Sequence, residues 1–353
     1  VNNTNCNIEL ENVYIQEKLR VIGLGEETNK RSIIFIKCFF GEVDFQFQHC
    51  ILKNFEIIKC KKSEANGTPK KGFVSLMSSR VYKVDILESS CSHLYFVFEN
   101  TPINNLYIRE SSIDKGINLF ISTCLKDEDR YIHNIYITGS NIGRAIFTGR
   151  IIGIPLDFTD SIFMGAPVFF DVNIPQGSIF PDAKSFRGKK GLETIKAFRC
   201  LRLAMEDQRA RDEEGLFYTL EQETILNTFH DKTKYISFNY WYKQTSNYGT
   251  CYKKPLVLLC LTFFFFLLFY ALLLTPVLGC QYAINWLLLE KTAVFSLKQV
   301  FVPFYSLKDL SPISSEKLDA ELLLRCFAVF QSVLSLTLIS LSLLAIRWKF
   351  KRG

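Results

Sequence analysis

The chain has 353 residues, and 48% of them are hydrophobic, a high share for a water-soluble protein. The formal net charge of +7 divides into +3 for residues 1–254 (33 basic and 30 acidic side chains) and +4 for the rest (9 basic and 5 acidic). So balanced a front part does not indicate nucleic-acid binding, and eleven cysteines without paired spacing do not indicate a disulfide framework. Residues 1–18 contain no basic region followed by an apolar core, so we expect no secretory signal and a cytoplasmic start.

Apolar residues recur every five positions through much of residues 35–172, a period that neither a helix nor a strand explains. The residue two positions before each centre is often small or aliphatic, as at Ser89, Ser111, Ser140 and Ser161. Four short strands that make one square turn of about twenty residues produce this pattern, with both positions pointing inward. The centres are Phe40, Phe45, Cys50, Phe55, Cys60, Val81, Ile86, Cys91, Phe96, Ile103, Ile108, Ile113, Ile137, Ile142, Phe147, Ile152, Phe158, Phe163 and Val168.

The stretches LDFTD, SIFMG and APVFF, residues 156–170, resemble the repeat of the pentapeptide-repeat family, whose members form right-handed quadrilateral β-helices. This resemblance implies a β-solenoid over residues 1–180 with degenerate repeats. We expect distorted coils, because Lys53 and Arg150 stand where a small residue belongs. The alternative is an ordinary β-sandwich whose inward residues fall on a five-residue spacing by chance.

Residues 181–254 are expected to form a helical linker and a membrane-interface collar. The apolar spacing within residues 191–226 predicts either one long interrupted helix, with Gly215 between its halves, or a helical hairpin. The predicted apolar faces hold Ile195, Phe198, Leu201 and Met205 in the first half and Phe217, Leu220 and Thr224 in the second.

Residues 235–255 are rich in aromatic and basic side chains, which are favoured at the headgroup level of a bilayer. We therefore expect an interfacial helix with Trp241, Tyr248, Lys253 and Lys254 as membrane anchors. A buried aromatic cluster under the β-helix is the alternative.

Residues 255–353 are expected to form a two-span transmembrane domain. The runs 256–274 and 326–346 are long enough, and uncharged, to cross a bilayer as helices. Arg347, Trp348 and Lys349 follow the second run as further anchors. Because basic residues precede the first span and follow the second, both termini are expected in the cytoplasm.

The segment between the spans is apolar but interrupted by charges. We expect a re-entrant or interfacial helix around residues 292–301, carrying Thr292, Ser296 and Lys298 and ended by Pro303. The alternative is an external amphipathic helix that caps the bundle.

Polar residues of the second span share one helical face at Gln331, Ser335 and Ser342. Polar side chains at mid-membrane avoid lipid, so this face lines a pore or packs against another helix.

The ordered segments FRCLRLAMEDQRARDEEGLFYTLEQE, YKQTSNYG, KKP, VFSLKQVFVPF and FQSVLSLTLISLSLLAIRWKF resemble bacterial membrane proteins that join pentapeptide repeats to a two-span, ion-channel-like domain. The resemblance covers residues 135–353. It implies a homo-oligomer in the bacterial inner (plasma) membrane, self-associating through transmembrane and linker helices, with the β-helix as a sensor or as a surface for a cytoplasmic protein partner. No potassium-type filter sequence occurs between the spans, so potassium conduction is not implied. The alternative is a membrane-anchored interaction scaffold without conduction.

Catalytic motifs are missing from the sequence. The stretch VIGLGEET, residues 21–28, lacks the third glycine of a dinucleotide loop, and the four histidines are scattered. We therefore expect no enzyme activity, no cofactor and no metal.

Overall fold

The structure is a computed structural model that describes residues 7–15, 18–23, 31–41, 43–62, 72–122, 124–229, 233, 235–274, 286–308 and 318–350. The chain divides into two compact units, Val1–Phe229 and His230–Gly353. The boundary places the first part of the expected linker, residues 181–229, with the preceding strands.

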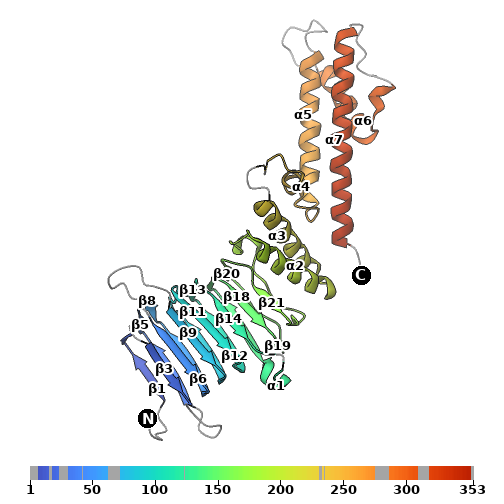
Figure 1. The fold of residues 1–353 in the computed structure, drawn as a ribbon. Helices are drawn as coiled ribbons and strands as arrows, with labels where there is room; N and C mark the ends of the chain where they lie inside the picture. Colours follow the sequence, from blue (N-terminus) through green and yellow to red (C-terminus); the bar gives the residue numbers. More distant parts are fainter. Residues whose placement is uncertain are drawn as a thin grey trace. The chain divides into compact units, whose positions relative to one another are not determined.

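The first unit is a β-solenoid of about six turns (Figure 1). Two long parallel sheets run along it, and strands adjacent in a sheet come from successive coils. One sheet contains β1 (Ile8–Glu11), β4 (Arg31–Ile36), β7 (Ile51–Ile58), β10 (Arg80–Leu87), β12 (Ile103–Arg109) and β16 (Asn134–Thr138). The other contains β3 (Lys18–Ile22), β6 (Asp44–Gln48), β9 (Gly72–Met77), β11 (Leu94–Glu99), β14 (Ile117–Phe120), β18 (Ala145–Thr148) and β21 (Val168–Phe170).

Shorter elements connect the two long sheets. They are β2 (Tyr14–Ile15), β5 (Phe39–Phe40), β8 (Lys61–Lys62), β13 (Ser112–Ile113), β15 (Tyr131–Ile132), β17 (Asn141–Ile142), β19 (Ile151–Ile152), β20 (Ile162–Phe163), α1 (Asp127–Arg130) and the 3₁₀ turn η1 (Ala183–Ser185).

The predicted solenoid is confirmed, and the β-sandwich alternative is wrong. Every five-residue centre named above is buried except Val168, which is half-buried in the last strand. The small residues before the centres, among them Ser89, Ser111, Ser140 and Ser161, are buried as well. Both inward positions of the repeat are therefore correct, because a parallel coil stacked on the next one buries the same register positions.

The coils are not four equal five-residue sides. β7 and β10 each have eight residues, and α1 adds an insertion between β14 and β15. These lengths explain why the period slips along the chain. Lys53 turns outward because Leu52 takes the buried place beside it, whereas Arg150 stays in the interior at 1% exposure.

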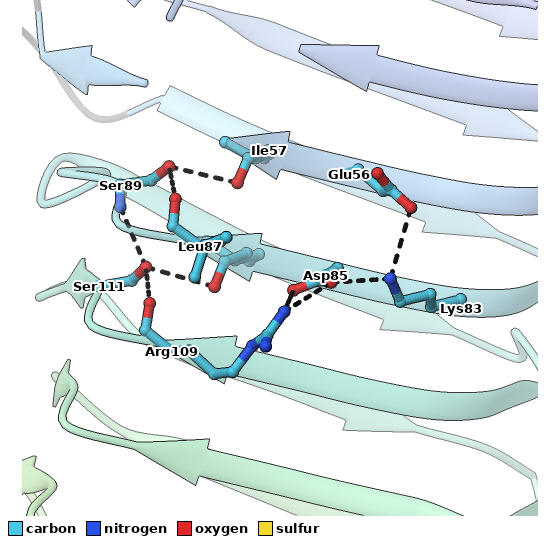
Figure 2. Close-up of polar contacts among 9 residues, drawn as sticks. Glu56, Ile57, Lys83, Asp85, Leu87, Ser89, Arg109 and Ser111 are labelled. Atoms are coloured by element: carbon cyan, nitrogen blue, oxygen red, sulfur yellow. Dashed lines mark hydrogen bonds and ion pairs between the residues drawn. The ribbon is translucent and has the colours of Figure 1, made fainter. Parts of the chain in front are cut away.

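One corner of the solenoid is held by a column of hydroxyl and thiol side chains, here called the serine column. From Cys60 onward, each side chain accepts a hydrogen bond from the backbone N–H of the column residue one coil earlier, at 3.1–3.3 Å. The Ser89 N–H, for example, donates to Ser111 Oγ at 3.1 Å. The hydroxyls also donate to backbone carbonyls, as Ser89 does to Leu87 and Ile57 in Figure 2. The members are Cys38, Cys60, Ser89, Ser111, Ser140 and Ser161.

Two helices cover the C-terminal end of the solenoid (Figure 1). They are α2 (Leu192–Asp207) and α3 (Arg211–Phe229), and they form the helical hairpin that was one of the two predicted arrangements. Their predicted apolar faces are buried, and Phe198, Leu201, Met205, Phe217 and Leu220 join the solenoid core. The break lies at residues 208–210 and not at Gly215, which is buried inside α3. Glu221 links the helices by accepting hydrogen bonds from Arg199 (2.7 Å) and Arg202 (2.9 Å).

The second unit is helical: α4 (Phe238–Ser246), α5 (Lys253–Leu274), α6 (Trp286–Phe301), the 3₁₀ turn η2 (Tyr305–Leu307) and α7 (Leu318–Phe350). Two of its helices, α5 and α7, are long and apolar enough to cross a membrane. At 1.5 Å per residue, the 22 residues of α5 span about 33 Å and the 33 residues of α7 about 50 Å, compared with about 30 Å for a hydrocarbon core.

Candidate functional site

The outward surfaces of α5 and α7 are apolar, whereas their contact contains polar side chains. Phe265 on α5 is 64% exposed and Leu272 is 74% exposed, and Phe330 and Leu343 of α7 are similarly open. Large contiguous apolar surface is costly in water and is normal against lipid. This distribution supports association with a membrane.

The buried face of α7 follows from its sequence. Its buried residues alternate in steps of four and three, which is the spacing of a helix that packs lengthwise against neighbouring helices. Several of them are small, so neighbouring backbones approach closely. The residues are Leu324, Ala328, Gln331, Ser335, Leu338, Ser342 and Ala345, with Ser332 beside Gln331.

A group of buried polar side chains, here called the polar seam, lies between α5, α6 and α7. Gln331 is fully buried at its centre. Its Oε1 accepts a hydrogen bond from Tyr270 on α5 (2.9 Å), and its Nε2 donates to Oγ (2.8 Å) and to the carbonyl oxygen (3.2 Å) of Ser296 on α6. One glutamine therefore joins all three helices. The members of the polar seam are Tyr270, Thr292, Ser296, Gln299, Gln331, Ser332 and Ser335.

The polar seam is only partly satisfied within the described residues. Ser332 donates to Gln299 Oε1 at 3.0 Å, but Gln299 Nε2 and Ser335 Oγ have no hydrogen-bond partner there. An unpaired polar group in a water-poor environment is costly unless water or another chain supplies a partner. Gln299 Nε2 and Ser335 Oγ are therefore the places in the polar seam where a further hydrogen-bond partner can bind.

The structure places the three residues expected to line a pore inside the helix contact of one chain. Gln331 and Ser335 are fully buried, and Ser342, 3% exposed, donates back to the Leu338 carbonyl at 2.8 Å. This arrangement is the one expected from the helix-packing alternative. Sequence reasoning did not select Tyr270 or Gln299, although Gln299 continues the Thr292–Ser296 face of its helix at a spacing of three.

The helix predicted between the spans is present. α6 ends at Phe301, two residues before Pro303, as expected, but it begins at Trp286, six residues earlier than the predicted start. Thr292 and Ser296 are fully buried against the spans. Lys298 is half-buried, and its Nζ lies 3.3 Å from the Tyr305 hydroxyl and 4.6 Å from the centre of that ring.

The expected membrane anchors differ in exposure. Trp241, 59% exposed, lies on α4. Lys253, Lys254, Arg347 and Lys349 are exposed near the ends of α5 and α7, and Trp348 is half-buried. Tyr248 is instead 2% exposed and packs edge-on against Tyr242 with ring centres 5.9 Å apart. This buried position differs from the exposed one expected of a membrane anchor.

The solenoid carries a second polar arrangement on the outer face of its six-stranded sheet (Figure 2). Asp85 is 5% exposed and pairs with Arg109 at 3.0 Å and with Lys83 at 2.8 Å. Burial lowers the pKa of Lys83, but Asp85 and Glu56 outweigh burial and leave that pKa raised. The cations lie 5.8 and 5.9 Å from the Tyr107 ring centre. This face therefore carries an ion-pair network beside an aromatic ring.

No metal centre is formed by three or more histidine, cysteine or acidic side chains in the part of the chain that the structure describes. Four of the nine described cysteines are buried in the solenoid. Burial raises the pKa of the Cys60 thiol to about 12, so that thiol is not a reactive nucleophile.

Comparison of the chain with family models, with curated proteins and with solved structures yields no match. The solenoid followed by two apolar helices agrees with the architecture that the sequence resemblance implies.

Proposed function

We propose that this chain is an oligomeric integral membrane protein with an ion-channel-like or pore-forming function, in which the β-solenoid serves as a cytoplasmic sensor or binding domain. The observation that carries the proposal is the docking of the short helix α6 against both spans through buried hydrogen bonds at Gln331. A 16-residue helix is too short to span, so its polar contacts in an apolar unit favour a specialised role over simple anchoring.

Two spans cannot enclose a conduit, so the pore must form between copies around a symmetry axis. Gln299 Nε2 and Ser335 Oγ are fully buried and have no hydrogen-bond partner among the described residues, so we propose that water inside the helix contact supplies their partners. The membrane we propose is the bacterial inner membrane, with both termini in the cytoplasm.

The test combines assembly with conduction. The full chain is purified in mild detergent, its mass is measured by light scattering, and it is then reconstituted into vesicles for ion-flux measurement. We expect a closed oligomer and a flux that Gln331→Leu reduces at least tenfold, whereas Phe330→Leu, on the lipid-facing side, leaves the flux unchanged. A monomer, or an oligomer without flux, contradicts the proposal.

A membrane-anchored interaction scaffold is the second candidate, and the ordered outer face around Asp85 favours it. Replacing residues 230–353 with an unrelated membrane anchor separates the two functions. Retained cellular activity after the exchange supports the scaffold, and lost activity supports the channel.

A further inference from the structure

The coil after α1 buries an arginine for which the described part of the chain supplies no hydrogen-bond partner. Arg150 follows β18 and is 1% exposed. Its Nε, Nη1 and Nη2 atoms make no hydrogen bond within the residues that the structure covers. A guanidinium carries five N–H donors, no acceptor and a permanent positive charge, so both its hydrogen-bonding capacity and its charge are uncompensated.

Arg150 stands in a second corner column of the solenoid, distinct from the serine column. The aligned pairs Phe47–Leu76, Leu76–Phe98, Phe98–Leu119 and Leu119–Phe147 fix the register of successive coils. Residues three positions further on therefore hold equivalent places in the register, and these are Cys50, Ser79, Thr101, Ser122 and Arg150. Ser122 departs from the others, because it is half-buried and its backbone N–H donates to Asn100 Oδ1 at 2.9 Å.

The early members of this column act as acceptors. The Cys50 N–H donates to Ser79 Oγ at 3.0 Å, and the Ser79 N–H donates to Thr101 Oγ1 at 3.5 Å. Arginine has no acceptor atom and cannot continue this ladder. Its presence in the interior is therefore not explained by the hydrogen bonding that stabilises the rest of the column.

A nearby arginine shows the usual solution. Arg130 donates to the Gly149 carbonyl at 2.8 Å, next to Arg150, and its charge is matched by Asp127 at 3.2 Å and Asp171 at 3.5 Å. Among the described residues, no carboxylate forms an ion pair with Arg150. Burial alone lowers its pKa to about 9, so at neutral pH the side chain is still charged.

We propose that Arg150 binds a small inorganic anion, of the size of chloride, in the interior of the solenoid. An anion supplies both the missing charge and an acceptor for the guanidinium donors. The two cavities described in this unit do not contain it: one of about 520 Å³ includes Ser122 in its lining, and one of about 400 Å³ includes Ile152 and Val172, but Arg150 lines neither. We therefore assign to Arg150 an anion no larger than chloride.

The first test measures thermal unfolding of the full chain in detergent while sodium gluconate is replaced by sodium chloride at constant ionic strength. We expect the midpoint to rise by about 3–5 °C for each tenfold increase of chloride above its dissociation constant. Arg150→Met should abolish the rise and should unfold at a higher temperature than the parent protein in gluconate. Arg144→Met, which removes an exposed arginine of the same coil, is the matched control and should retain the rise. Equal chloride responses in all three proteins overturn the proposal.

The second test does not depend on a variant. Crystals of the full chain soaked in sodium bromide should give an anomalous peak within hydrogen-bond distance of the Arg150 guanidinium. Ordered water alone at that place, or no density, overturns the proposal.

Discussion

Replacing Ser111 by alanine removes one member of the serine column. Ser111 is 4% exposed, and its Oγ accepts from the Ser89 N–H at 3.1 Å and donates to the Arg109 carbonyl at 2.8 Å. The change deletes both hydrogen bonds and leaves the Ser89 N–H buried without this acceptor. A buried donor left unpaired costs about 1–3 kcal/mol, so we expect the free energy of unfolding of the solenoid to fall by about 2 kcal/mol.

The assay must report on the solenoid alone. All three tryptophans of the chain, Trp241, Trp286 and Trp348, lie in the second unit, so tryptophan fluorescence follows the wrong part of the protein. Hydrogen exchange of peptides that contain Ser89, measured by mass spectrometry on the full chain in detergent, follows the column directly. A loss of about 2 kcal/mol corresponds to about 30-fold faster exchange.

A neighbouring serine provides the control. Ser112 is half-buried, and its hydroxyl donates to the Asp114 carboxylate at 2.7 Å in an exposed contact outside the column. Ser112→Ala should change stability by less than about 0.5 kcal/mol. If the two alanine variants exchange equally fast, the hydrogen bonds of the serine column do not stabilise the solenoid.

Three further changes have definite expected results. Gly143→Ala drives a Cβ into the Asp114 carbonyl oxygen of the neighbouring coil and should cost about 3 kcal/mol or more in urea unfolding, whereas Gly165→Ala, with its nearest atom at 3.4 Å, should be tolerated. Burial lowers the pKa of His93, so on acidification the unfolded state binds a proton before the native state does. The free energy of unfolding should therefore fall as the pH drops below about 6.5. His93→Gln should remove this pH dependence from unfolding midpoints measured between pH 7 and pH 5. Gln331→Leu should lower the stability of the second unit by about 1–2 kcal/mol in tryptophan-monitored thermal unfolding, with Phe330→Leu close to neutral. A tolerated Gly143→Ala, an unchanged pH slope, or equal effects at positions 330 and 331 would each contradict the corresponding argument.

The repeat of the solenoid was predictable because its inward positions are local and periodic. Centres such as Phe55, Ile108 and Phe147 are buried as expected, since each coil repeats the same environment for the same register position. The slips in the five-residue period were visible in the sequence, but their cause was not. The structure shows that β7 and β10 lengthen one side of the coil and that α1 is inserted between β14 and β15. Lys53 and Arg150 looked alike in the sequence, and only the stacking of coils decided that one turns outward and the other stays inside.

The second unit likewise has features that the sequence predicted and features that it did not. The lengths of the two apolar helices and the end of α6 before Pro303 follow from composition and from the missing N–H of proline. The partners of Gln331 did not follow, because Tyr270 and Ser296 are 61 and 35 residues away and meet it only when three helices pack.

The sequence by itself determined the period of the solenoid, the two spans and the polar face of the second, because these depend on residues a few positions apart. Tertiary structure alone decided which polar groups find partners. A hydrogen bond between residues far apart in the sequence forms only after packing brings them together. Packing provides hydrogen-bond partners for Ser111 and Gln331, whereas the Arg150 guanidinium and Gln299 Nε2 have none among the described residues.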